Sequence, residues 1–106
     1  MAVPFKAPVK DITFGYEVID SYNILNKISE FSDFSEDIVI PTMEECAKFS
    51  EEVLAPINAI GDQQGATIDN GVVKMPQEFV DAYKKFAEAG WASISLPEEI
   101  GVEANQ

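Results

Sequence analysis

The sequence predicts a mainly α-helical fold: a small helical domain with an extended N-terminal arm and one short β-hairpin at about residues 67–74. Apolar residues recur at steps of three and four along residues 39–60, which is the spacing of one face of a helix. An Asn70-Gly71 pair stands between two apolar runs, as in a tight hairpin. Two prolines near the start of the chain favour an extended beginning.

The N-terminal arm is predicted by Pro4 and Pro8. Each proline removes a backbone donor and biases the residue before it toward an extended conformation. We therefore assign residues 1–13 to an arm and residues 14–106 to the helical domain.

The first helices of that domain are predicted in residues 14–28. Their apolar positions fit two short helical pieces, and Asp20-Ser21, residue types that favour helix caps, mark the break between the two.

A longer helix follows, with its apolar stripe at Val39, Met43, Cys46, Ser50, Val53, Ile57 and Ile60. Pro41 suits a first turn and Pro56 predicts a kink inside the pattern, while Gly61 is the expected C-terminal stop.

The remaining elements are a hairpin, a second helix and an apolar run. Asn70-Gly71 supplies the two positive φ angles of a type I′ turn. Pro76 predicts the first position of the next helix and Gly90 its cap. The run from Trp91 to Leu96 is expected to be buried against the helices.

Composition excludes several classes of function. The chain has 7 lysines, 19 acidic residues, a formal net charge of −12, and neither histidine nor arginine. Without histidine there is no imidazole base or metal ligand, and without arginine no bidentate clamp for phosphate. So negative a chain is not expected to bind nucleic acid or an anionic membrane.

Cysteine usage and hydropathy bear on localisation. Cys46 stands alone, so an intrachain disulfide is excluded, and we expect a reducing, cytoplasmic setting. The sequence contains neither the continuous apolar core of a signal peptide nor a run long enough to span a membrane.

The residues that could carry chemistry also have simpler interpretations. The pairs Glu44-Glu45 and Glu51-Glu52 could act as acid and base or hold a cation, but a solvated helix face is the preferred interpretation. Residues 62–69 lack the alternating ligands of a calcium loop. Cys46, on the apolar stripe, is interpreted as a buried, inert thiol. We therefore predict no metal site.

The tyrosines and Trp91 could stack on a planar ligand, although core packing is the preferred interpretation. The glycines form no phosphate-binding pattern.

Three stretches in order give a more specific indication: residues 5–14 (FKAPVKDITF), 44–58 (EECAKFSEEVLAPIN) and 82–91 (AYKKFAEAGW). Together they resemble the start of an acyl-CoA dehydrogenase, in particular the longer bacterial type with an extra N-terminal arm. The resemblance runs from about residue 3 to residue 101.

The resemblance implies an FAD-dependent oxidoreductase of fatty acid metabolism that introduces a Cα–Cβ double bond into an acyl-CoA. In that family the flavin and the catalytic carboxylate are held mainly outside the N-terminal helical domain. We therefore carry over no catalytic and no cofactor-binding residue, and we expect this chain alone to bind no FAD and to be inactive. Acyl-CoA would be bound only by a complete enzyme.

One family motif, a Pro-Glu-x-x-Gly-Gly-x-Gly loop leading to the substrate pocket, reads Pro97-Glu98-Glu99-Ile100-Gly101-Val102-Glu103-Ala104 here. By resemblance, Glu99 and Gly101 are the candidate substrate-pocket residues. The later glycines are missing, which suggests a truncation or an altered reading frame.

Two functional hypotheses follow. The first is a structural, acyl-pocket-covering helical domain or fragment of an acyl-CoA dehydrogenase, whose partners are the remaining domains or a second copy in a homodimer. The second is a stand-alone acidic helical interaction module that self-associates or binds a partner protein. A weaker third hypothesis is an acidic cation-binding domain.

Overall fold

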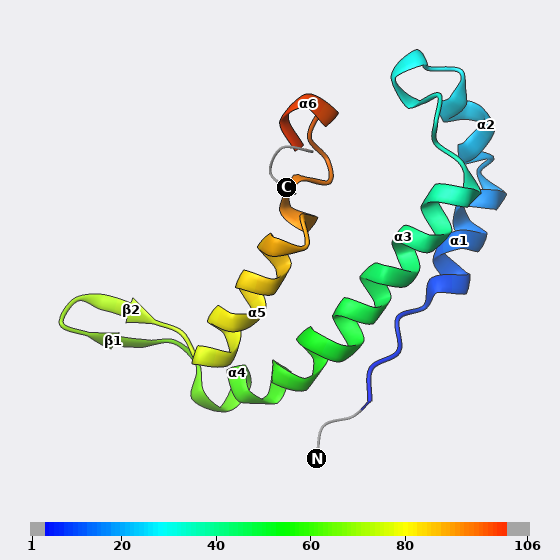
Figure 1. Cartoon of the computed structure of the whole chain (residues 1–106). Helices are drawn as coiled ribbons and strands as arrows, with labels where there is room; N and C mark the ends of the chain where they lie inside the picture. The colour runs from blue at the N-terminus through cyan, green and yellow to red at the C-terminus, as the bar shows by residue number, and fades with distance from the viewer. Residues whose placement is uncertain (1–3, 102–106) are drawn as a thin grey trace. The chain divides into compact units, whose positions relative to one another are not determined.

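The computed structural model describes residues 4–101. The chain divides between Pro56 and Ile57 into two compact units. Helices dominate both, and the second also holds a two-stranded antiparallel hairpin (Figure 1). The predicted fold class, mainly α with one short hairpin, is confirmed.

In the first unit, α1 (Val9–Val18) is followed by α2 (Ser21–Asn26) and a 3-10 turn at Ser29–Phe31. The break between the two helices lies where the sequence predicts it. Asp20 takes a left-handed conformation with φ of 58°, and its Oδ1 accepts a hydrogen bond from Asn23 Nδ2 at 2.8 Å. A short polar side chain can adopt this conformation at low cost, which allows the chain to change direction there.

The extended arm is shorter than predicted. The helix begins at Val9, and Pro8 occupies the position just before it, with its carbonyl accepting from the Ile12 amide at 3.0 Å. Proline is tolerated there because the first helical residues need no donor. Pro8 therefore starts a helix and does not prolong the arm. Ala7 N–H fixes the arm by donating to Glu51 Oε1 at 3.2 Å.

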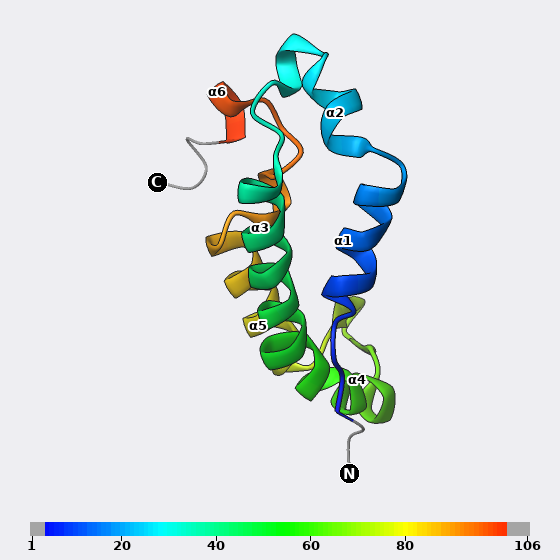
Figure 2. The same cartoon turned by 90° about the vertical axis from the view of Figure 1, so that its right-hand side faces the viewer.

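Helix α3 (Glu36–Phe49) packs beside α1 (Figure 2). It begins after Ser35, so Pro41 lies within the helix and not in its first turn as predicted. Two irregular turns follow: a π-helical turn at Ser50–Leu54 and a 3-10 turn at Ala55–Ile57. The Ala55 amide bonds the Ser50 carbonyl, five residues back. Pro56 has no amide hydrogen with which to continue the α-helical hydrogen bonds. The regular hydrogen-bond pattern is therefore interrupted here, at the position where the sequence predicts a kink.

The second unit opens with α4 (Asn58–Gln64), which does not stop at Gly61. Its end is at Gly65, whose φ of 63° and ψ of −167° form a backbone conformation that essentially only glycine adopts. Gly61 has a different role. The Phe79 ring lies directly on its backbone, where an added Cβ would overlap Cζ and approach Cε1 to 2.9 Å.

The hairpin pairs β1 (Thr67–Asp69) with β2 (Val72–Lys74) in the register Thr67↔Lys74, Ile68↔Val73 and Asp69↔Val72. The two turn residues, Asn70 and Gly71, have φ of 52° and 78°. Both angles are positive, as a type I′ turn requires, so the predicted hairpin is confirmed.

Helix α5 (Gln77–Glu88) follows, and Pro76 stands at its N-cap, one position earlier than predicted. Gly90, with φ of 83°, ends it and leads to a 3-10 turn at Trp91–Ser93 and a short helix α6 (Glu98–Gly101). The apolar run after Gly90 is not buried as predicted: Trp91 is half-buried, and Ile94 and Leu96 are exposed.

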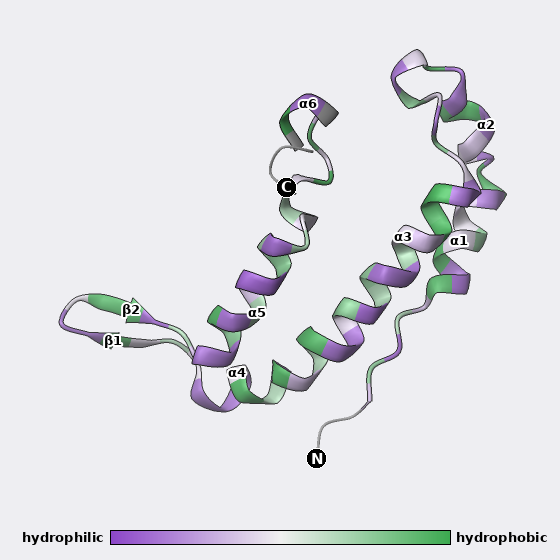
Figure 3. Ribbon diagram, viewed as in Figure 1, coloured by the Kyte–Doolittle hydropathy of each residue, from purple (hydrophilic) through white to green (hydrophobic). Residues whose placement is uncertain are grey.

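Few apolar side chains are buried. Those that are buried within residues 4–101 are Val39, Ala47 and Ala82, together with Pro76. Green apolar positions occur along the ribbon of both units (Figure 3), and large exposed side chains include Phe14, Val18, Ile19, Ile68, Val73, Tyr83 and Ile94. Neither unit therefore covers much of its own apolar surface.

Candidate functional site

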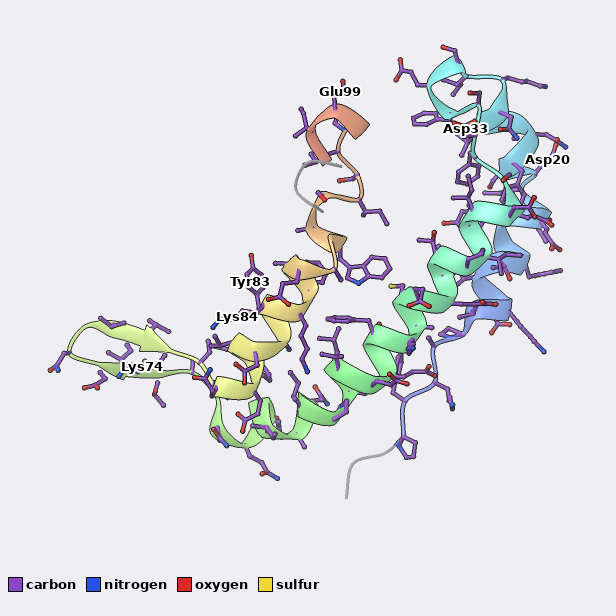
Figure 4. The ribbon with its side chains drawn as sticks, viewed as in Figure 1. Asp20, Asp33, Lys74, Tyr83, Lys84 and Glu99 are labelled. Carbon is purple, nitrogen blue, oxygen red and sulfur yellow. The ribbon has the colours of Figure 1, made fainter. Side chains whose placement is uncertain are left out.

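A pocket of about 310 Å³ lies in the first unit where α1, α2 and the start of α3 meet. Its lining includes three carboxylate residues, Glu17, Asp20 and Glu36, together with Tyr22. Asp20 is labelled at this end of the unit in Figure 4. The local break at Asp20 brings α2 against α1 and so creates the hollow.

Three aromatic rings pack together next to the pocket. Tyr22 and Phe34 have ring centroids 5.3 Å apart, and Tyr16 lies 6.1 Å from Tyr22 and 6.2 Å from Phe34. These spacings are typical of aromatic pairs in a core. Tyr16 and Tyr22 therefore pack against other rings of the chain, in agreement with the preferred interpretation, whereas Tyr83 is exposed and contradicts it.

The Tyr22 hydroxyl is the polar group most affected by this environment. It is buried, and within residues 4–101 it has no hydrogen-bond partner. Burial raises the pKa of Tyr22, and the charges of Glu36 and Glu17 raise it further, with a smaller effect of Tyr16. The group is thus a neutral donor at physiological pH. Sequence patterns do not predict this pocket directly, although aromatic residues lie on either side of the predicted break.

The pocket does not fit a flavin dinucleotide. A pyrophosphate needs cationic or N–H donors, and three carboxylates would repel it. The pocket therefore contributes no flavin-dependent step.

The acidic pairs on α3 and the π-helical turn are largely solvated, as the preferred interpretation held. Glu44, Glu45 and Glu52 are exposed. Glu51 is half-buried, since it holds the Ala7 amide and lies 3.9 Å from Lys6 Nζ. These carboxylates are not gathered into an acid–base pair. In the part of the chain that the structure describes, no group of three or more acidic or cysteine side chains is placed to hold a metal ion.

The prediction of a buried Cys46 is wrong. Its thiol is free and its side chain exposed, while the next residue, Ala47, is buried. The buried face of α3 includes Val39 and Ala47, which are eight residues apart. Cys46 lies one position before Ala47, so its side chain points away from this face. An apolar stripe alone does not show which of its edges is covered.

The candidate substrate-pocket residues lie in α6. Glu99 is exposed and labelled on this helix in Figure 4, and Gly101 is its last residue. The remainder of the motif, residues 102–104, lies outside the described residues. The structure brings no other candidate site residue into this helix, so the role of Glu99 and Gly101 stays a prediction.

Comparison with known proteins identifies the relationship. Over 97 residues, 92% of its length, the chain is 35% identical to 3-methylmercaptopropionyl-CoA dehydrogenase of Ruegeria pomeroyi. The chain resembles part of an acyl-CoA dehydrogenase. It spans 16% of the length of that relative. No protein-family model matches the sequence.

The similarity to an acyl-CoA dehydrogenase agrees with the family that the three stretches predict. The first stretch begins in the arm and continues into α1, and the other two lie in helical segments and at their ends. No helix among the described residues is long and apolar enough to cross a membrane.

Proposed function

We propose that this chain is the N-terminal helical domain of an acyl-CoA dehydrogenase-like flavoprotein, where it acts as a structural part and covers the acyl-chain side of the substrate pocket. The complete protein would carry out FAD-dependent α,β-dehydrogenation of an acyl-CoA in the cytoplasm. The observation that carries the proposal is the 35% identity over 92% of the chain to an enzyme of this kind.

The exposed apolar surface supports a structural role. Burying apolar area contributes about 25 cal/mol per Å², so large side chains left in water mark surfaces that other protein covers. Such side chains occur in both units, for example Val18 at the end of α1, Ile19 directly after it, and Tyr83 in α5. A domain that packs on further domains has this character.

The chemistry belongs elsewhere in the complete protein. No residue described here combines burial, a base and a partner in the way that proton abstraction from an acyl-CoA needs. The acidic pocket beside Tyr22 does not suit a flavin, so we assign FAD and the catalytic base to the remaining domains. The arm, held by Glu51, would lie at a subunit interface of a homodimer.

The test is the mass and colour of the native protein, isolated from its source cells with an antibody against this segment. A yellow species several times heavier than 11.7 kDa, with acyl-CoA dehydrogenase activity, is expected. A colourless 11.7 kDa species would contradict the proposal and favour the stand-alone interaction module. Stoichiometric FAD or turnover on the isolated 106-residue chain would contradict the proposed inertness.

A further inference from the structure

The hairpin of β1 and β2 has two unlike faces. Side chains alternate across a strand, so Thr67, Asp69, Val72 and Lys74 share one face. Lys74 Nζ lies 3.2 Å from Asp69 Oδ2 on that face, which confirms the polar character of that side. The opposite face consists of the directly paired Ile68 and Val73.

This apolar pair is open to solvent. Ile68 is 75% exposed and Val73 63%. A two-stranded hairpin is marginally stable in water by itself, and β-branched cross-strand pairs gain most of their stabilisation when the face they form is covered. The hairpin is nevertheless well specified, because Asn70 and Gly71 adopt the turn conformation that fixes its register. A hairpin whose register is specified and whose apolar face is open is therefore a candidate docking element.

Charge indicates what kind of surface covers it. The chain carries −12 overall, but residues 65–76 contain one acid, Asp69, and one base, Lys74, and are neutral. A neutral apolar element can approach an apolar surface without electrostatic cost, whereas two copies of the whole chain repel one another. A second copy is therefore the less favourable occupant. The relative, of which the chain spans 16%, has ample further surface.

We propose that the Ile68 and Val73 face of the hairpin docks on an apolar surface of the remaining domains of the same polypeptide. The inference rests on the proposed function and adds which element makes the contact and with which face. Val72 on the polar face stays in solvent.

Hydroxyl-radical footprinting reads side-chain exposure directly. It is applied to the native protein, isolated with an antibody that binds outside the hairpin, and to the isolated 106-residue chain at two concentrations. The oxidation rates of Ile68 and Val73 are expected to fall severalfold in the native protein. Val72, which is 58% exposed in the same strand as Val73, is the internal control and stays reactive.

The outcomes separate the two proposals. If the native protein is longer but Ile68 and Val73 react as fast as in the isolated chain, the docking is wrong and the proposed function stands. If the native species is the 11.7 kDa chain, the proposed function fails and the docking with it. Protection already present in the isolated chain would overturn the docking, and protection that increases with concentration would identify a second copy as the occupant.

A pair of variants gives an independent measurement. Ile68→Lys is expected to lower the melting temperature of the complete protein clearly, and Val72→Lys, on the other face, much less. Both variants should melt like the unmodified protein in the isolated chain, where neither face is covered. Equal effects of the two substitutions in the complete protein would contradict the proposal.

Discussion

Tyr22 couples the stability of the first unit to alkaline pH. Its hydroxyl is buried without a partner among the described residues, and burial together with Glu36 and Glu17 raises its pKa above the ordinary value of 10.0. On raising the pH, the unfolded chain therefore loses this proton before the folded chain does. The contribution to stability is complete below pH 10 and is lost as the pH rises through the folded pKa.

We expect the melting temperature to fall above pH 10, and Tyr22→Phe to reduce that fall. Since phenylalanine also removes the unpartnered hydroxyl, the variant should be at least as stable as the unmodified chain at pH 7. Tyr83→Phe, at an exposed position, is the matched control and should leave stability at pH 7 unchanged. Melting curves followed by circular dichroism at pH 7 to 11 test this. If the melting temperature of Tyr22→Phe falls above pH 10 as steeply as that of the unmodified chain, the prediction is wrong.

Gly61 is a second residue whose effect is local. Gly61→Ala would normally favour a helix, but here the new methyl group meets the Phe79 ring, with Cε1 and Cε2 at 2.9 and 3.0 Å. Overpacking of this kind costs about 1–3 kcal/mol, and we expect such a loss in urea unfolding. Gly15→Ala in α1, where an added Cβ meets nothing within 4 Å, should gain about 0.5–1 kcal/mol.

A rescue experiment separates the clash from other effects. Combining Gly61→Ala with Phe79→Leu removes the ring from the glycine, so the loss in the double variant should be smaller than the sum of the two single losses. Additive losses would mean that the ring is not the cause.

At the scale of the element, the hairpin depends on one glycine. Gly71 has φ of 78°, and a side chain in this region costs about 1–2 kcal/mol. Gly71→Ala is expected to abolish the cross-strand NMR contacts between Ile68 and Val73 while the helical circular dichroism signal remains. Asn70→Gly keeps both positive φ angles accessible and should preserve the hairpin. Loss of the pairing in both variants would contradict this account.

The elements that the sequence predicts correctly are those fixed by local chemistry. The hairpin follows from Asn70-Gly71, and the break between the first two helices follows from Asp20, since each residue needs only its own backbone conformation. The prediction that α4 stops at Gly61 is wrong because packing of Phe79, 18 residues later, decides what that glycine does. The predicted arm is too long for a similar reason. A proline just before a helix and a proline in an extended segment have the same local backbone preference, so Pro8 alone does not distinguish the two.

The candidate site was harder to predict for the same reason. The sequence contains Tyr22, Glu17 and Glu36, but only the packing of three elements brings them around one pocket. Burial of Cys46 and of residues 91–96 depends on what lies over them, and within the described part of the chain little does. Whether such an apolar surface is buried depends on contacts with other segments, and the periodic pattern of one helix carries no information about those contacts.

At the scale of the whole molecule, a high negative charge opposes an exposed apolar surface. Mutual repulsion at −12 keeps separate chains apart in dilute buffer, and the Debye length falls from about 30 Å at 0.01 M salt to about 3 Å at 1 M. We therefore expect the isolated chain to sediment at higher mass as sodium chloride is raised at pH 7. A mass that is independent of salt would show that the apolar faces do not attract one another.

The π-helical turn at Ser50–Leu54 has a consequence for length variation. Because the Ala55 amide reaches back five residues instead of four, the turn holds one residue more than a regular helix would. Inserting or deleting a single amino acid destabilises most helices, since it rotates all following side chains by about 100° around the helix axis. Here the turn already contains one extra residue, so deleting the exposed Glu52 would restore α spacing, keep Glu51 for the Ala7 amide, and leave Phe49 and the turns before it undisturbed.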